Sequence, residues 1–84
     1  MPRPPLTPEQ LAEGRRLAAE IRKAREQRNR EQADLARGSG VSVDAIRALE
    51  ANRVTAPSFL TVARLARELG LPLDDLAARA LGRP

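Results

Sequence analysis

The sequence predicts a single all-α domain. A chain of 84 residues has the length of one domain. Hydrophobic residues make up 42% of it, and many of them are Leu and Ala, which favour helix. Phe59 is the only aromatic residue, whereas a β-sandwich or barrel normally contains more aromatic and β-branched side chains. The order of apolar and helix-breaking residues along the chain is that of five helices.

The first element is a long helix from residue 7 to about residue 27 or 28. Residues 1–6 contain three prolines and are expected to form a disordered arm. Thr7 can cap the helix, Pro8 suits its first position, and Gln10 completes a capping box. The inner stripe is expected to comprise Leu17, Ile21 and Ala24.

Two short helices follow, over residues 31–37 and 43–51. Asn29 can adopt the left-handed conformation that ends the preceding long helix. The helix over residues 31–37 is expected to end at Gly38-Ser39-Gly40. Ser42 can cap the second helix. A tight turn therefore joins two short helices.

The last two helices complete a domain that spans residues 7–82. Ser58 caps the fourth helix and Gly70 ends it. This helix is expected to bury Phe59, Val62, Ala63, Leu65, Ala66 and Leu69. The fifth helix covers residues 73–81, with Leu73, Leu76, Ala77 and Ala80 on its apolar side.

Composition argues against several classes of function. The chain has neither cysteine nor histidine, so it lacks thiolate metal ligands and the commonest general base and metal ligand. We therefore expect no catalytic residues, no metal and no cofactor, and the protein is not expected to be an enzyme. No apolar run reaches the ~18 residues of a membrane span, and the proline-rich start does not resemble a signal peptide. A cytoplasmic, nucleoid-associated protein is expected.

The chain carries a formal net charge of +4, and Lys23 is its only lysine among 15 basic residues. Such an arginine excess suits a phosphate-rich partner. A GC-rich coding sequence would give the same excess of arginine without any functional cause. The positions of the arginines along the chain therefore have to show whether the charge serves a function.

The stretch over residues 32–51, Q-A-D-L-A-R-G-S-G-V-S-V-D-A-I-R-A-L-E-A, is the most informative part of the sequence. Ala36 supplies a small residue where the two short helices cross, and Gly40 can adopt the positive φ of the turn. Val41, Ile46 and Leu49 can hold the second helix against the core. This geometry presents the outer face of helix 43–51 to a DNA major groove.

These residues carry a resemblance to a known family. Six fragments occur in order between about residues 17 and 76: L-A-A-E-I-R-K-A-R, E-Q-A-D-L-A, G-V-S, A-I-R-A-L-E, A-P-S-F-L-T-V-A-R-L-A-R-E-L-G-L and L-D-D-L. In this the chain resembles the Cro/C1-type (XRE-like) helix-turn-helix domain. The resemblance implies a compact, five-helix, lambda-repressor-like fold. It also implies a transcriptional regulator that binds a palindromic operator in double-stranded DNA as a homodimer.

The resemblance further assigns a role to individual residues. The base-facing positions would be Val43, Asp44, Arg47 and Ala48. The DNA backbone would be met by Gln32, Ser42, Asn52, Arg53, Thr55 and Ser58. Arg47 is the only strong guanine reader in the first set. Asp44 can accept from cytosine N4, but its charge at a helix start also has a purely structural explanation.

Arg25 and Glu50 are expected to form a structural ion pair with no direct DNA role. Arg25 follows Ile21 by one turn, near the inner stripe of the first helix. A carboxylate at the C-terminal end of a helix, where Glu50 stands, is disfavoured by the helix dipole unless a cation lies close by. The resemblance brings this arginine and this glutamate together.

An alternative hypothesis is a protein-interaction module, antitoxin-like or an adaptor, whose DNA binding is weak or lost. Glu31 and Asp44 support it, because both place negative charge where phosphates would lie. RNA binding is disfavoured, because one phenylalanine gives no stacking platform.

Overall fold

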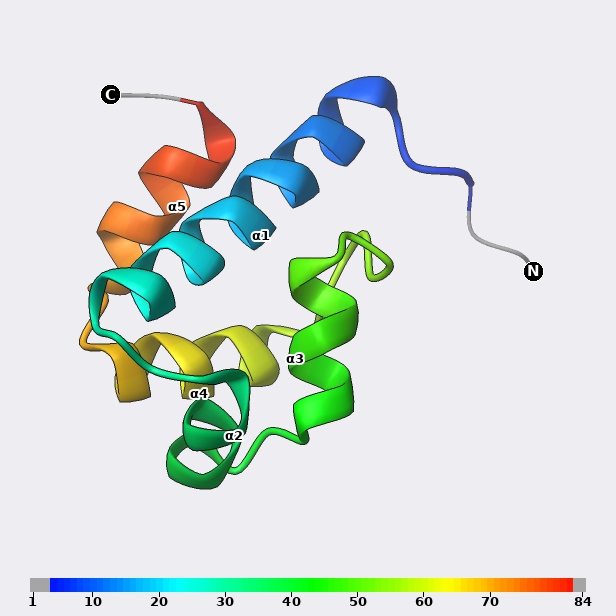
Figure 1. Ribbon diagram of the computed structural model, residues 1–84. Coiled ribbons are helices and arrows are strands. Elements are labelled where there is room, and N and C mark those ends of the chain that lie inside the picture. Colours follow the sequence, from blue (N-terminus) through cyan, green and yellow to red (C-terminus); the bar gives the residue numbers. More distant parts are fainter. Residues whose placement is uncertain (1–3, 83–84) are drawn as a thin grey trace.

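The computed structural model describes residues 4–82, and within them it contains five helices (Figure 1). They are α1 (Pro8–Gln27), α2 (Gln32–Ser39), α3 (Val43–Glu50), α4 (Phe59–Leu69) and α5 (Leu73–Leu81). The all-α prediction is confirmed. Residues 1–3 of the expected arm lie outside the described residues, and Leu6 is half-buried before α1 begins.

Local capping explains where three of the helices begin. The Thr7 hydroxyl accepts from the Gln10 backbone N–H, and the Gln10 side chain accepts from the Thr7 N–H, as the capping box requires. Ser42 and Ser58 cap α3 and α4, each accepting from the N–H three residues ahead. These starts follow from sequence because a cap needs only neighbouring residues.

The turn between α2 and α3 depends on a left-handed residue. Gly40 has φ of 78°, a conformation that a Cβ disfavours. The Ser39 hydroxyl is buried just before it and accepts from the Val41 N–H at 3.1 Å. Asn29 has φ of 52°, so it does terminate the α1 segment in the left-handed region.

The predicted end of α2 was wrong. The helix does not break at Gly38 but continues to Ser39 and ends only at Gly40. A Cβ on Gly38 would meet only the ends of the Glu68 and Arg30 side chains, which are flexible enough to shift. These two side chains form an ion pair across that spot, with 2.8 Å between Arg30 Nη1 and Glu68 Oε2.

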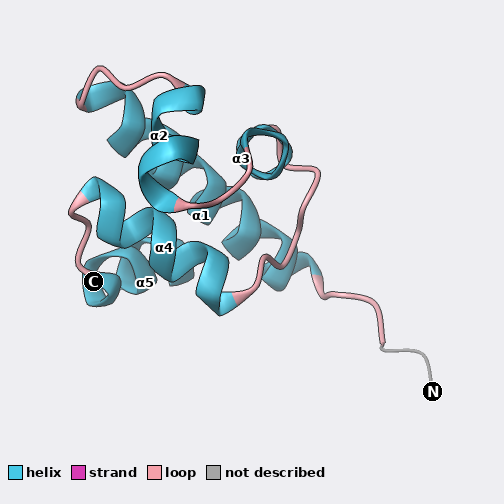
Figure 2. Cartoon of the chain, turned by 90° about the horizontal axis from the view of Figure 1, so that it is seen from below, coloured by secondary structure: helices cyan, strands magenta, loops and turns pink. Residues whose placement is uncertain are grey.

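One core receives side chains from all five helices. α1 runs alongside α5, while α2, α3 and α4 surround the other end of the core (Figure 1). Figure 2 shows α3 end-on beside α2, with the loop that follows α3 passing around the outside to α4. The largest fully buried side chains are Ile21, Leu35, Ile46, Leu49, Leu65 and Leu69, and Leu76 of α5 packs against them.

The prediction that Phe59 is buried was wrong, because this side chain is 68% exposed. Phe59 is the first residue of α4, and helical side chains lean toward the helix N-terminus. Its ring is therefore in solvent and not in the core. Leu73, the first residue of α5, and Ala77 were expected on the apolar side of α5, and both are exposed.

Candidate nucleic-acid interface

Arg25 of α1 and Glu50 of α3 lie in contact and form a bidentate pair. Arg25 Nε donates to Glu50 Oε2 at 2.8 Å, and Nη2 donates to Oε1 at 2.8 Å. Their side chains are only 12% and 4% exposed. Two parallel charge-assisted hydrogen bonds shielded from water fix both distance and orientation. This pair sets the position of α3 relative to α1.

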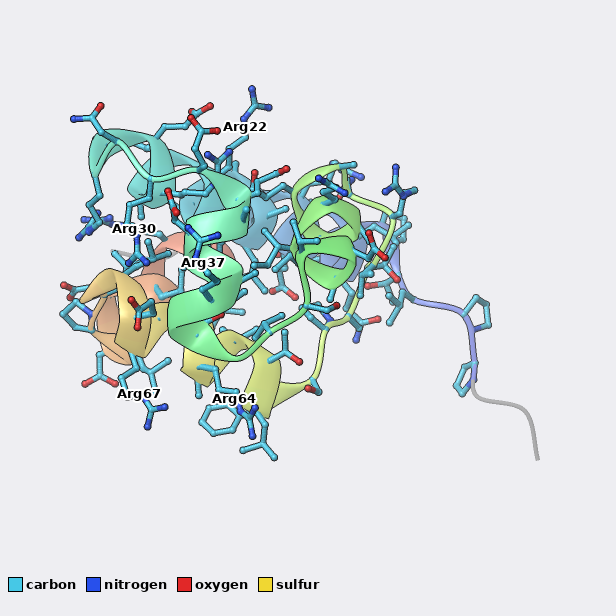
Figure 3. All side chains as sticks on the ribbon, turned by 60° about the horizontal axis from the view of Figure 1, so that its bottom comes forward. Arg22, Arg30, Arg37, Arg64 and Arg67 are labelled. Carbon is cyan, nitrogen blue, oxygen red and sulfur yellow. The ribbon has the colours of Figure 1, made fainter. Side chains whose placement is uncertain are left out.

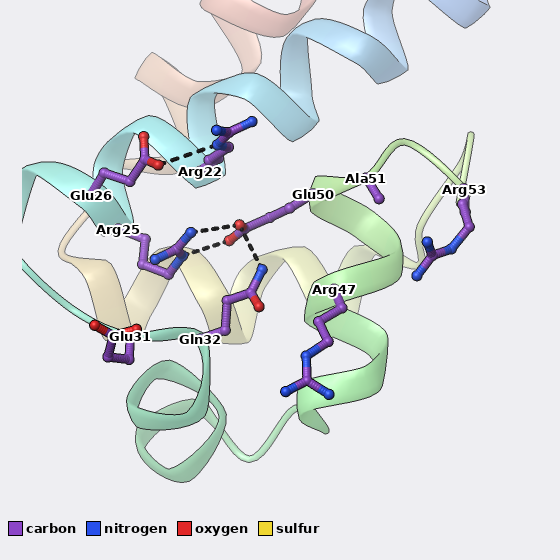
Figure 4. A pocket seen from close by; sticks show the side chains of 9 residues that line it. All are labelled: Arg22, Arg25, Glu26, Glu31, Gln32, Arg47, Glu50, Ala51 and Arg53. Carbon is purple, nitrogen blue, oxygen red and sulfur yellow. Dashed lines mark hydrogen bonds and ion pairs between the residues drawn. The ribbon is translucent and has the colours of Figure 1, made fainter.

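Gln32, the first residue of α2, joins the same network (Figure 4). Its Nε2 donates to Glu50 Oε1 at 3.0 Å. The remaining terminal nitrogen of Arg25, Nη1, donates to the backbone carbonyl of Arg30 at 2.8 Å. The network therefore joins α1, the loop after it, α2 and α3.

The electrostatics of the network favour its charged form. Burial opposes ionisation of Glu50, but the hydrogen bonds from Arg25 and Gln32, together with the positive charges of Arg25 and Arg22, outweigh it and hold the pKa of Glu50 below its usual value. The hydrogen bond to Glu50 raises the pKa of Arg25, against the effect of burial. Both groups remain ionised at neutral pH.

An open cleft of about 510 Å³ lies over this network (Figure 4). Its walls come from α1, α2, α3 and the loop after α3, and they comprise Arg22, Arg25, Glu26, Glu31, Gln32, Arg47, Glu50, Ala51 and Arg53. Glu50 neutralises Arg25, and Glu26 lies 3.3 Å from Arg22 Nε. Arg22 and Arg47 are each held only by an exposed ion pair, whereas Arg53 and the Glu31 carboxylate have no ion-pair partner among residues 4–82.

The outer face of α3 is exposed at two charged positions. Asp44 and Arg47 are exposed, whereas Val43 and Ala48 beside them are half-buried. Arg47 Nη1 lies 3.5 Å from Asp44 Oδ1, three residues earlier on the same helix. Such exposed pairs contribute only about 0–1 kcal/mol, so Arg47 can leave Asp44 for another acceptor at little cost.

The N-terminus of α2 opens onto the cleft without a side-chain cap. Glu31 occupies the capping position but makes no capping hydrogen bond. The first backbone N–H groups of an α-helix have no partner inside the helix, and they carry a partial positive charge. Together with the Gln32 side chain, this end of α2 can receive a phosphate.

The other residues assigned to the DNA backbone are dispersed. Asn52, with φ of 63°, lines a neighbouring hollow along α1. Thr55 lies against α1, where a Cβ on Gly14 would come within 2.5 Å of the Thr55 carbonyl oxygen. The hydroxyl of Ser58 accepts from the Thr61 N–H and donates to the Thr61 hydroxyl. Of the six predicted residues, the structure brings only Gln32 and Arg53 into the cleft with Arg47.

Sequence reasoning did not single out Arg22 as a cleft residue or Arg30 as an ion-pair partner. Arg22 precedes Arg25 by three residues, so helical spacing puts both on one side of α1, and this signal could have been used. Arg30 and Glu68 are 38 residues apart, and no local pattern connects them.

Two further observations concern residues 4–82. No group of His, Cys, Asp and Glu side chains in this range is arranged to hold a metal ion. None of the helices there combines the length and apolar character needed to cross a membrane.

One known protein family matches this chain. A helix-turn-helix family model matches residues 21–76, more than half of the chain. The match runs from the middle of α1 into α5 and includes the whole motif over residues 32–51. Comparison with curated proteins gives no match. Domains of the matching family are DNA-binding and regulatory and are not typically enzymes. The chain therefore belongs to the Cro/C1-type helix-turn-helix family of DNA-binding regulators.

Proposed function

We propose that this protein is a sequence-specific transcriptional regulator that binds a palindromic operator as a homodimer, acting in the cytoplasm on the nucleoid. One observation carries the proposal: the Arg25–Glu50–Gln32 network holds α3 against α1 and α2 while the face with Asp44 and Arg47 stays open. A rigidly held helix with a free polar face is what insertion into a major groove requires.

Base recognition centres on Arg47. Its guanidinium can leave Asp44 and donate to both O6 and N7 of a guanine. Val43 and Ala48 offer only apolar contact, suited to a thymine methyl group, and Asp44 can accept from cytosine N4. With one strong base reader, the remaining specificity would come from the shape and deformability of the DNA.

Phosphate contacts position the helix in the groove. The open N-terminus of α2, the Gln32 side chain and Arg53 lie around the cleft beside Arg47. Ser42, Asn52, Thr55 and Ser58 are exposed but lie outside this cleft, so contacts from them would need DNA that extends beyond it. Such contacts fix register and orientation, and they carry no sequence information directly.

A protein-interaction module remains the second candidate. Two exposed carboxylates, Glu26 and Glu31, line the cleft, and Asp44 already pairs with the one strong base reader. A basic protein partner would meet these groups more favourably than a phosphate would.

Selection from a pool of random duplexes distinguishes the two candidates. The regulator should enrich one site with two-fold symmetry, because a symmetric dimer presents two copies of α3 to half-sites about one helical turn apart. Fluorescence anisotropy on that site, at about 50 and 200 mM salt, should show much weaker binding at the higher concentration. No enrichment and no binding at the lower concentration would favour the interaction module.

A further inference from the structure

A second depression, the α1 hollow, lies along α1 beside the cleft. It measures about 510 Å³, and Arg22, Glu26 and Glu50 line both the hollow and the cleft. The other residues around the hollow are Arg15, Ala18, Ala19, Lys23 and Asn52. Because the two depressions share three residues, a ligand long enough to leave the cleft on this side would enter the α1 hollow.

The α1 hollow contains an excess of positive charge. Arg15 is exposed and has no ion-pair partner among residues 4–82. The positions one helical turn from it carry no carboxylate, since they hold Leu11, Ala12, Ala18 and Ala19. Arg22 is held only by an exposed pair with Glu26, which costs little to open. Arg25 already neutralises the Glu50 carboxylate. Two guanidinium groups are therefore available to an anion in this hollow.

Arg15 and Arg22 lie on one side of α1, at a spacing that suits a nucleic-acid backbone. They are seven residues apart, which corresponds to about 10 Å along the helix axis. That distance spans about three nucleotides of one DNA strand, since each nucleotide advances about 3.4 Å. Ala19 lies between them, is exposed and extends no further than a methyl group. A DNA strand can therefore approach α1 closely enough for both guanidinium groups to reach phosphates.

The α1 hollow continues the surface proposed to meet DNA. Asn52, in the loop after α3, lines the hollow, and Arg22 lines the cleft together with Arg47 (Figure 4). The loop lies tightly against α1, because a Cβ on Gly14 would come within 2.5 Å of the Thr55 carbonyl oxygen. DNA that lies over the cleft and this loop therefore passes next to the α1 hollow.

We propose that α1 is a second phosphate-binding element, in which Arg15 and Arg22 bind the DNA backbone beside the phosphates met by the cleft. The inference rests on the proposed function and deepens it, because it concerns the same DNA. The helix-turn-helix family model matches residues 21–76, so residues 8–20 of α1, with Arg15 among them, precede the match. The Arg15 contact is therefore an addition to the part of the domain that the family model matches, and it lengthens the stretch of DNA that the chain covers.

Salt titrations of the parent and two variants on one scrambled duplex test the role of Arg15. The logarithm of the parent's association constant should fall linearly with the logarithm of salt concentration. Arg15→Ala should reduce this slope by about one, the loss of one phosphate contact. Arg15→Lys should restore most of the slope, because lysine also binds phosphate as a charge. Circular dichroism should show the same helix content in all three proteins, since alanine and lysine both favour helix.

Arg67→Ala is the matched control for Arg15→Ala. It removes the same charge from an exposed arginine that makes no ion pair among residues 4–82. Figure 3 shows Arg67, with Arg64, on the opposite side of the molecule from Arg22. The salt slope of Arg67→Ala should therefore equal that of the parent.

A second pair of variants tests the α1 hollow without removing an arginine. Ala19→Glu places a carboxylate between Arg15 and Arg22, and it should weaken duplex binding several-fold at low salt. Ala77→Glu adds the same charge at an exposed alanine of α5 that lines neither the cleft nor the α1 hollow. This control should bind the duplex nearly as well as the parent.

The inference is overturned if Arg15→Ala keeps the parent's salt slope or if Arg67→Ala lowers the slope equally. It is also overturned if Ala19→Glu binds the duplex as well as Ala77→Glu. In each of these cases the parent still binds DNA, so the proposed function stands. A parent protein that binds no duplex at about 50 mM salt would refute the proposed function, and this inference with it.

Discussion

Arg25 and Glu50 lie 25 residues apart in the chain, yet two hydrogen bonds of 2.8 Å join their side chains, which are largely shielded from water. The pair fixes α3 with respect to α1, and Gln32 extends this constraint to α2. Interactions that hold a recognition helix in place affect DNA binding through structure, even if they never touch DNA.

Breaking the Arg25–Glu50 pair should destabilise the protein strongly. Removal of one partner leaves an uncompensated charge in a site that is almost closed to water, at a cost of about 3–5 kcal/mol. A domain of this size has only a small margin of stability, so Glu50→Ala should lower the melting temperature markedly and weaken DNA binding as a consequence. Thermal melts of the two single Ala variants and the double variant give the coupling energy.

Replacing both members, as in Arg25→Met with Glu50→Leu, should recover much of the loss because no charge is then left unpaired. Lys23→Ala is the control: Lys23 is exposed on α1, makes no ion pair among the described residues, and should melt like the parent. Additive effects of Arg25→Ala and Glu50→Ala would show that the two side chains do not interact.

The lowered pKa of Glu50 makes stability depend on pH. A carboxylate with a lower pKa in the folded protein than in the unfolded chain contributes stability that is fully present above its unfolded pKa, about 4.3 for Glu. This contribution is lost as the pH falls from there through the folded value. Urea unfolding between about pH 7 and pH 3 should show this loss in the parent.

The Glu50→Gln variant isolates this group. The variant should have a lower free energy of unfolding than the parent at neutral pH. This difference in free energy should shrink in acid, because a protonated Glu50 resembles Gln. A constant difference across the whole range would mean that Glu50 does not titrate in this window.

Arg47→Ala and Gln32→Ala should weaken DNA binding in different ways. The Arg47 substitution should cost about 1–3 kcal/mol on the selected site and relax the preference at one base pair. The Gln32 substitution should weaken binding to all sequences alike, because phosphates do not report sequence. Anisotropy with the selected site and a scrambled duplex measures both. Equal binding by Arg47→Ala and the parent on both duplexes would mean that α3 does not read the groove.

Asp44→Asn should strengthen binding to duplexes that lack the selected site. The substitution frees Arg47 from its 3.5 Å contact and removes a negative charge from the face that meets phosphates. It should lower stability by only about 0.3–1 kcal/mol, the usual value of a charge at a helix N-terminus. Titration of a scrambled duplex checks the gain, and unchanged or weaker binding would show that Asp44 does not oppose the DNA.

Features set by neighbouring residues could be predicted from the sequence. Thr7, Ser42 and Ser58 mark helix starts because a cap acts over three residues, and Gly40 marks a turn because few other residues accept its φ. The family resemblance added the Arg25–Glu50 pair, which no local pattern could supply.

Features set by packing between distant elements could not be predicted. The exposure of Phe59 depends on whether another helix covers the first turn of α4, and spacing along the helix does not reveal this. α2 continues through Gly38 to Ser39, and the Arg30–Glu68 pair beside Gly38 joins residues far apart in the chain. The dispersal of Asn52 and Thr55 depends on how the loop after α3 lies against α1.

The most direct test of the central claim is a salt titration of duplex binding with the selected site. If Arg47, Arg53 and the α2 terminus meet phosphates and bases as proposed, the logarithm of the association constant should fall linearly with the logarithm of salt concentration. The slope should correspond to several released counterions, and Arg53→Ala should reduce it by about one. A flat titration, or no binding at about 50 mM salt, would contradict the account.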